Sequence, residues 1–323
     1  MLSAMQVFNG YIMPLITERF PQAIDKFNAA SNNTITLSSE GITGSIFEQS
    51  FYNALHSSKR RVNRFAARTN VAETDLTQSK HVTVKVAGGF GPLTFEPSQM
   101  TWLQKPTQEG LTVASDQFVE ALMADQLNTA VAALVAATSN NAAVTTDVSG
   151  AAIAQTTINS GLAKFGDASA SIRALVMTGM QYHKLVGDAI ANANSLYEIG
   201  GIAVREGSTF GQGRAIIVTD APALTVAGTP NKQIVLGLTV NAIVVKDGND
   251  VITNVETKNG GTRIYSSFQA DYTFSLDMKG YSWDKVNGGE SPDDTAIATG
   301  SNWDQDVTSH KHTAGIVIIG DEA

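Results

Sequence analysis

The chain has 323 residues, a formal net charge of −8 and no cysteine. A chain of this length exceeds one small core and is expected to form about two domains. The missing cysteines exclude disulfides, thiolate metal sites and cysteine nucleophiles. The acidic balance argues against nucleic-acid binding by the whole surface, and the absence of any run of 18 apolar residues argues against a membrane span.

The first 50 residues predict an arm rather than a core. The helical character of LITERFPQAIDKFNAA is interrupted by Pro21, and SNNTITLSSEGITG after it has few side chains able to build a core. The start of the chain lacks the charged and apolar regions of a signal peptide. We therefore expect the protein to remain in the cytoplasm where it is made. The polar first 50 residues are expected to form an arm that packs on a partner surface.

A basic stretch, HSSKRRVNRFAAR, follows from His56 to Arg68. No acidic residue lies between Glu48 and Glu73 to balance its charge. Its five cations are Lys59, Arg60, Arg61, Arg64 and Arg68. So dense a positive charge in an acidic chain requires an explanation of what it faces.

A β-hairpin is predicted over about 81–96. Apolar and polar residues alternate there, and Gly88-Gly89 marks the expected turn. The apolar positions are Val82, Val84, Val86, Phe90, Leu93 and Phe95. Because an isolated two-stranded hairpin is marginal in water, we expect this one to lean on the body of its own chain or on a neighbouring subunit.

The strongest helical pattern spans about 111–138. Apolar residues recur there at three- and four-residue spacing, and the Ala-rich end favours close packing against another backbone. At 1.5 Å per residue, roughly 28 residues extend about 42 Å, which is long for a globular domain.

An α/β block over 150–245 and a long strand over 262–283 complete the pattern. The block alternates helical segments with short apolar strands such as RALVMTG and QIVLGLTVNAIVVK. In the long strand, apolar even positions alternate with polar odd positions, which indicates a half-buried strand. The apolar run 313–319 is the expected partner strand.

This order of elements resembles the major capsid proteins of tailed bacteriophages with the Hong Kong 97 fold. The most similar segments are LVMTGMQYHKLV (175–186), FSLDMKGYSWD (274–284), ESPDDTAIATGSNWDQ (290–305) and TSHKHTAGIVII (308–319). The resemblance implies an α+β fold with four parts. These are an N-terminal arm (1–50), an extended loop (51–110), an α/β A-domain (150–245) and a P-domain (111–149 plus 246–323) with a spine helix and long strands.

The resemblance also implies a function and partners. The chain would self-assemble into hexamers and pentamers of an icosahedral shell enclosing the double-stranded DNA of a tailed phage. We expect a virion location, assembly in the host bacterial cytoplasm, a portal, no membrane and no cofactor. A separate scaffolding protein is expected, since only about 110 residues precede the spine helix and all are assigned. Whether a decoration protein binds outside is left open.

Three interpretations of the basic stretch remain open. It could form a solvated face of a short helix, contact packaged DNA non-specifically, or pair with carboxylates of another subunit, where Arg suits bidentate contacts. The possible acidic partners are Asp293, Asp294, Asp304 and Asp306. The hairpin would in the same way lie over a neighbour.

Other functions find little support in the sequence. No HExxH, GxSxG or Walker A motif occurs, and His310 and His312 lack a third metal ligand nearby in the sequence. The alternatives are an encapsulin-like compartment, another phage structural protein such as a tail or decoration component, and a soluble α/β enzyme. An enzyme would draw on Asp167, His183, Asp188 and Arg205 of the α/β block.

Overall fold

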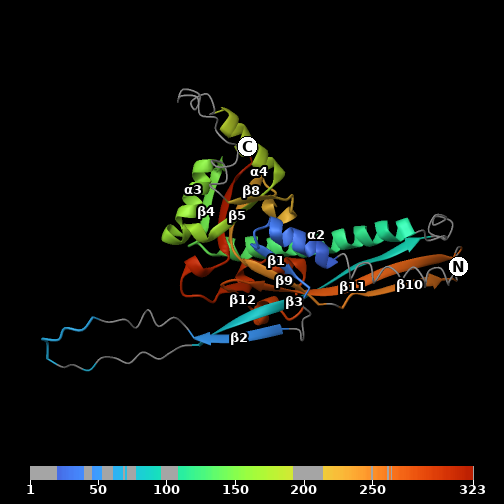
Figure 1. Ribbon diagram of the computed structural model, residues 1–323, viewed down its shortest axis with the longest axis horizontal. Helices are drawn as coiled ribbons and strands as arrows, with labels where there is room; N and C mark the ends of the chain where they lie inside the picture. The colour runs from blue at the N-terminus through green and yellow to red at the C-terminus, as the bar shows by residue number, and fades with distance from the viewer. Residues whose placement is uncertain are drawn as a thin grey trace.

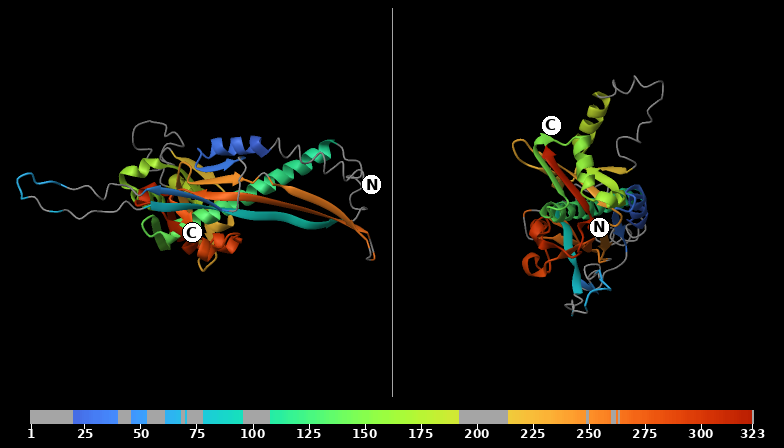
Figure 2. Two further views of the ribbon diagram at one scale, coloured as in Figure 1. Left: turned by 90° about the horizontal axis from the view of Figure 1, so that it is seen from below. Right: turned by 90° about the vertical axis from the view of Figure 1, so that its left-hand side faces the viewer.

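The computed structural model describes residues 20–39, 46–52, 61–67, 70, 78–95, 108–191, 214–248, 250–259, 262 and 264–322. These residues form an elongated molecule in which one long helix, α2, runs past two β-sheets (Figure 1). Seen from below, the long strands β3 (Gln78–Phe95) and β11 (Tyr265–Met278) run along the length of the molecule (Figure 2). The mixed helix and strand content agrees with the predicted α+β class.

Helix α2 (Gln108–Asn140) confirms the predicted spine helix, which begins three residues earlier and ends two later than expected. It contacts β9 and β11 of one sheet and β4 and β14 of the other. Small side chains allow this close approach, since Ala130, Ala133 and Ala137 are buried. From Gln117 to Asn140 the helix is long and apolar enough to cross a membrane by composition, but here it lies across the core of the body.

The first sheet has the strand order β1-β9-β11-β3-β2, with β10 paired to β11. Its strands are β1 (Ile35–Ser38), β2 (Ile46–Tyr52), β3 (Gln78–Phe95), β9 (Ile243–Asp247), β10 (Ile252–Lys258) and β11 (Tyr265–Met278). β1 and β9 are parallel, and the other pairs are antiparallel.

The alternation of the long strand is confirmed in β11. Its even positions from Ala270 to Met278 are buried, and Phe274 and Leu276 are fully so. The strand ends at Met278, because Gly280 turns the chain with φ +76°. The remainder of the predicted strand is β12 (Tyr281–Trp283), which pairs with β13 (Trp303–Gln305) instead.

The predicted hairpin over 81–96 is wrong. β3 is one continuous strand of 18 residues, paired with β2 on one side and with β11 on the other. Gly88 lies opposite Tyr272, and a Cβ on Gly88 would stand 2.7 Å from the tyrosine ring. Glycine is therefore needed at this position because the Tyr272 ring lies over it, and not because the chain turns there.

The valines of this strand are already buried without a neighbouring subunit. Val82, Val84 and Val86 are buried in the core of their own chain. The expected neighbour contact is therefore corrected for these three positions, because β3 is a central strand whose face is covered within the same chain.

The described part of the N-terminal arm belongs to the body. Residues 20–30 are helical, and β1 extends the first sheet by pairing with β9. Phe20, Ile24, Ile35 and Leu37 are buried in the main core. The expectation that this segment has few core-forming side chains is wrong, since alternate residues of the short ITLS strand are enough to cover the edge of the core.

The second sheet has the order β4-β14-β8-β5-β6, with β7 paired to β8. Its strands are β4 (Thr145–Ala152), β5 (Ile172–Met177), β6 (Ala215–Val218), β7 (Thr225–Val226), β8 (Lys232–Thr239) and β14 (Gly315–Asp321). Its helices are α3 (Gln155–Ala163) and α4 (Gly179–Ala191), and short helical turns are η2 (Gly166–Ser171) and η4 (Pro222–Leu224). A separate core forms between α3, α4 and this sheet.

Two strand assignments are corrected by this topology. The run 313–319 is not a partner of the long strand, because β14 lies in the second sheet between β4 and β8. The run QIVLGLTVNAIVVK is two strands in two sheets, β8 and β9, separated by Asn241 at φ +51°. The C-terminal strand thus joins the α/β part of the chain.

The segment between β12 and β14 holds the remaining short elements. They are α5 (Lys285–Gly288), α6 (Asp294–Ile297), η5 (Gly300–Asn302) and η6 (His310–His312). Trp283 and Trp303 pack edge to face with centroids 4.8 Å apart and anchor this segment to the body. Gly300 lies against α2, where a Cβ would stand 2.7 Å from the Ala136 carbonyl oxygen.

Candidate assembly surface

Residues 61–67, here called the tip segment, lie at the opposite end of the long axis from β10 (Figures 1 and 2). Every described side chain in it is exposed, and Phe65 is fully so. Arg61 and Arg64 make no ion pair with the described residues. Phenylalanine and arginine are both enriched at protein–protein interfaces, so this composition favours a contact surface.

The tip segment is not helical. It has no regular secondary structure apart from a turn at Arg64 and Phe65, and the Phe65 amide donates to Asn63 Oδ1 at 3.0 Å. The interpretation of the basic stretch as a short helical face is therefore wrong for these residues, because the asparagine side chain stabilises a turn. Lys59, Arg60 and Arg68 lie outside the described residues.

Three of the four predicted acidic partners are exposed. Asp293 is the N-cap of α6 and accepts a hydrogen bond from the Ala296 amide at 2.7 Å. Asp294 lies in the first turn of α6, and Asp304 lies on β13. None of the three forms an ion pair within the described part of the chain.

Asp306, the fourth, is engaged inside its own chain. Its Oδ2 lies 2.6 Å from His81 Nδ1, and its side chain is 5% exposed. The prediction that Asp306 is available to a neighbouring arginine is corrected, because the carboxylate is buried against a histidine from β3. Sequence reasoning gave His81 no role, since its two acidic partners come from distant parts of the chain.

The apolar positions at the far end of β3 have different environments. Phe90 packs within the chain against Phe118 and Tyr272, at ring-centroid distances of 5.5 and 5.3 Å. Leu93 is 63% exposed, while the side chain of Phe95 lies outside the described residues. Other exposed apolar residues at this end are Ile252, Ile264 and Tyr265. Exposed apolar side chains therefore lie at both ends of the molecule, in addition to single ones on α4, β6, β7 and α5.

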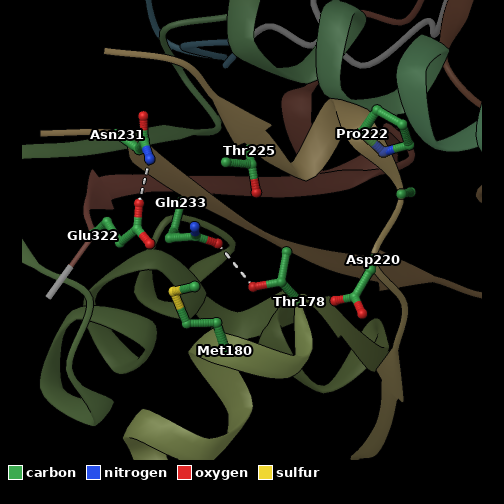
Figure 3. A pocket seen from close by; sticks show the side chains of 9 residues that line it. Thr178, Met180, Asp220, Pro222, Thr225, Asn231, Gln233 and Glu322 are labelled. Carbon is green, nitrogen blue, oxygen red and sulfur yellow. Dashed lines mark hydrogen bonds between the residues drawn. The ribbon is translucent and has the colours of Figure 1, made fainter. Parts of the chain in front are cut away.

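A cavity of about 360 Å³ lies in the second sheet region beside α4 (Figure 3). Its polar side chains satisfy one another, since Thr178 donates to Gln233 at 2.8 Å and Asn231 donates to Glu322 at 2.6 Å. Asp220 accepts from the Gly179 amide at the start of α4. Asp220 thus caps the start of α4, and the residues that line the cavity present no paired acid and base.

The residues considered for an enzyme do not converge. Asp167 forms an ion pair with Lys311, and Asp188 pairs with Lys184 one helical turn away on α4. His183 is exposed against Tyr182, and Arg205 lies outside the described residues. His310 and His312 lie in the turn η6 rather than on a strand. Within the described ranges, no group of three or more His, Asp or Glu is placed to hold a metal.

A family model for the major capsid protein 13-like proteins matches residues 4–317. The chain belongs to this major capsid protein family. Membership implies a structural, non-enzymatic role in a phage shell. No curated protein sequence matches the chain.

Solved phage structures share the fold of this capsid protein. The cyanophage Pam1 capsid asymmetric unit aligns with a TM-score of 0.52 and 12% identity, covering 90% of this chain and 88% of that one. The structure from Mycobacterium phage Adephagia gives 0.51 and 13%, covering 89% of each chain. At such identities the likeness establishes the fold, which is the Hong Kong 97 type expected from the sequence.

Proposed function

We propose that this capsid protein forms an icosahedral shell of hexamers and pentamers that encloses the double-stranded DNA of a tailed phage. The observation that carries this proposal is the family match over residues 4–317. The exposed apolar and basic groups at the two ends of the elongated chain support it, because a shell subunit needs several contact surfaces rather than one cleft. The proposed role requires no catalysis.

The proposal includes the partners of such a shell. A separate scaffolding protein guides closure, a portal occupies one vertex, and the packaged DNA is contacted non-specifically. The proposal is compatible with a decoration protein on the outside of the shell. The subunit is assembled in the host bacterial cytoplasm and ends in the virion.

Within this shell, the tip segment contacts the C-terminal part of a neighbouring copy. Arg61 and Arg64 carry charges that their own described chain leaves unpaired, as do Asp293, Asp294 and Asp304. Guanidinium and carboxylate groups form strong, directional hydrogen bonds when an interface removes them from water. The exposed tip segment thereby replaces the hairpin as the neighbour-contacting part of the loop.

Expression of the chain alone and together with a candidate scaffolding protein tests the proposal. Sedimentation and electron microscopy should find closed shells of uniform size when both are present. Tubes or irregular shells from the chain alone would support shell formation and the need for scaffolding. A chain that stays monomeric under both conditions contradicts the proposal, and uniform shells from the chain alone contradict the scaffolding part of it.

A further inference from the structure

His81 is held between two carboxylates from distant parts of the chain. Its Nε2 lies 2.8 Å from Asp277 Oδ1 on β11, and its Nδ1 lies 2.6 Å from Asp306 Oδ2, just after β13. The His81 side chain is 17% exposed and that of Asp306 is 5% exposed. One imidazole thus joins β3, the long strand β11 and the segment between β12 and β14 (residues 284–314), here called the C-terminal segment.

With both carboxylates ionised, this geometry requires a protonated ring. A neutral imidazole has one N–H, so one of its two nitrogens would direct a lone pair at a carboxylate oxygen. The imidazolium donates from both nitrogens, and each bond is charge-assisted. Asp306 also has a buried Oδ1 that finds no hydrogen-bond donor, which leaves the His81 cation as the group that balances this carboxylate.

The other charged groups around His81 balance one another. Glu48 on β2 accepts from Lys285 of α5 and lies 3.6 Å from Lys80 of β3. Hydrogen bonds from His81 to Asp277 and then Asp306 raise the pKa of the imidazole to about 9, against the opposing effect of burial. Among the described residues, the two aspartates are therefore the charged groups that determine the pKa of His81.

The position of His81 gives the contact a mechanical role. It is the fourth residue of β3 and lies opposite Gln49 of β2. β2 and β3 flank the loop that carries the tip segment, so His81 lies at the base of this loop. A bond at this point restrains how the loop leaves the body.

We propose that protonated His81 is a latch that clamps the base of the loop to β11 and to the C-terminal segment, and that removal of its proton releases the clamp. The latch lies within one chain, so it is independent of shell assembly. Its contribution to stability is fully present below the unfolded pKa of about 6.5 and declines as pH rises through the folded value. The loop base is therefore tight at neutral pH and loosens in alkaline solution.

Histidine Cε1 hydrogen–deuterium exchange, read by mass spectrometry on the full chain, measures the pKa of each of the five histidines. We expect His81 to titrate above pH 8. Asp306→Asn should return it toward the value of an ordinary histidine. A wild-type His81 that titrates near pH 6.5 overturns the latch, and this measurement needs no variant that might fail to fold.

His81→Gln tests the mechanical part, with His312→Gln as a matched control at an exposed position. At pH 7, amide exchange in residues 46–52 and 78–82 should be at least about tenfold faster in His81→Gln than in wild type. Exchange in β14 should not change, and the control should match wild type throughout. Equal exchange at the loop base in all three proteins would overturn the proposal.

The alkaline response provides a second readout. Between pH 7 and 9.5, the unfolding equilibrium constant of wild type in urea should rise by about fiftyfold more than that of His81→Gln. A variant that keeps the full wild-type pH dependence would show that another group titrates, and the latch would be rejected.

Discussion

Tyr272 on β11 donates a 2.6 Å hydrogen bond to Asp125 Oδ2 on α2, and this bond joins the long strand to the long helix. The ring packs between Phe90 and Phe274. Burial and the Asp125 hydrogen bond both raise the pKa of the phenol, so it remains un-ionised and donates throughout the neutral range. This hydrogen bond links helix and sheet beside a cluster of aromatic side chains.

Tyr272→Phe should lower the free energy of unfolding by about 1.5 kcal/mol, because a hydrogen bond to a charged group is lost while the ring packing remains. Tyr265→Phe is the control, since Tyr265 is on the same strand and its side chain is partly exposed. Urea denaturation of the two variants beside wild type gives the comparison. Equal losses in both would show that the Tyr272–Asp125 bond contributes nothing specific.

Gly88→Ala tests whether β3 is a continuous strand beneath Tyr272. The new methyl would stand 2.7 Å from the ring, so we expect a loss of about 1–3 kcal/mol from overpacking. Gly187→Ala on α4 meets no atom within 4 Å and should instead stabilise the chain by about 0.5–1 kcal/mol. A neutral Gly88→Ala, measured in the same denaturation series, would favour an exposed turn at Gly88.

Charge reversal at the tip segment should weaken assembly without weakening the subunit. The double variant Arg61→Glu, Arg64→Glu removes cations that form no ion pair with the described residues of their own chain. The free energy of unfolding should therefore stay within about 0.5 kcal/mol of the wild-type value. Shell yield should fall severalfold, and raising salt should weaken wild-type assembly in the same direction. Lys164→Glu, an exposed cation after α3, is the control. Full shell yield from the double variant would leave the tip without a role in assembly.

Asp293 offers a way to separate a local cap from a contact with another subunit. Asp293→Asn keeps a good N-cap for α6 but removes the charge, whereas Asp293→Ala removes both. If the carboxylate pairs with a neighbouring arginine, both variants should assemble poorly, and only the alanine variant should lose about 1 kcal/mol of subunit stability. Normal assembly of Asp293→Asn would exclude this aspartate as a partner.

The sequence predicted those elements whose periodicity is strong and local. The 33-residue helix α2 and the alternating face of β11 follow from side-chain spacing alone. The hairpin failed because a Gly-Gly pair predicts a turn, and only the Tyr272 ring on a distant strand explains the glycine. The same limit applies to β14, whose apolar run fits either sheet until its neighbours β4 and β8 are known.

The sequence composition pointed to the basic stretch as a contact surface. The contacts in the structure then showed which of its expected acidic partners are available. The unbalanced cations of the basic stretch are visible in the sequence, and the exposed Arg61 and Arg64 agree with a contact surface. The engagement of Asp306 by His81 was not predictable, because residues 225 positions apart meet only after the fold has formed. Phe65 within this basic stretch was a sequence signal for a contact surface, because aromatic residues and arginine are enriched at interfaces.

Cryo-electron microscopy of the assembled particle can show directly what the tip segment contacts. We expect a closed icosahedral shell built from this chain, in which residues 61–67 of one copy lie over the C-terminal segment of a neighbouring copy, with Arg61 or Arg64 within about 4 Å of a carboxylate. A particle whose wall is made of another protein, or a shell in which the tip segment folds back on its own chain, would contradict it.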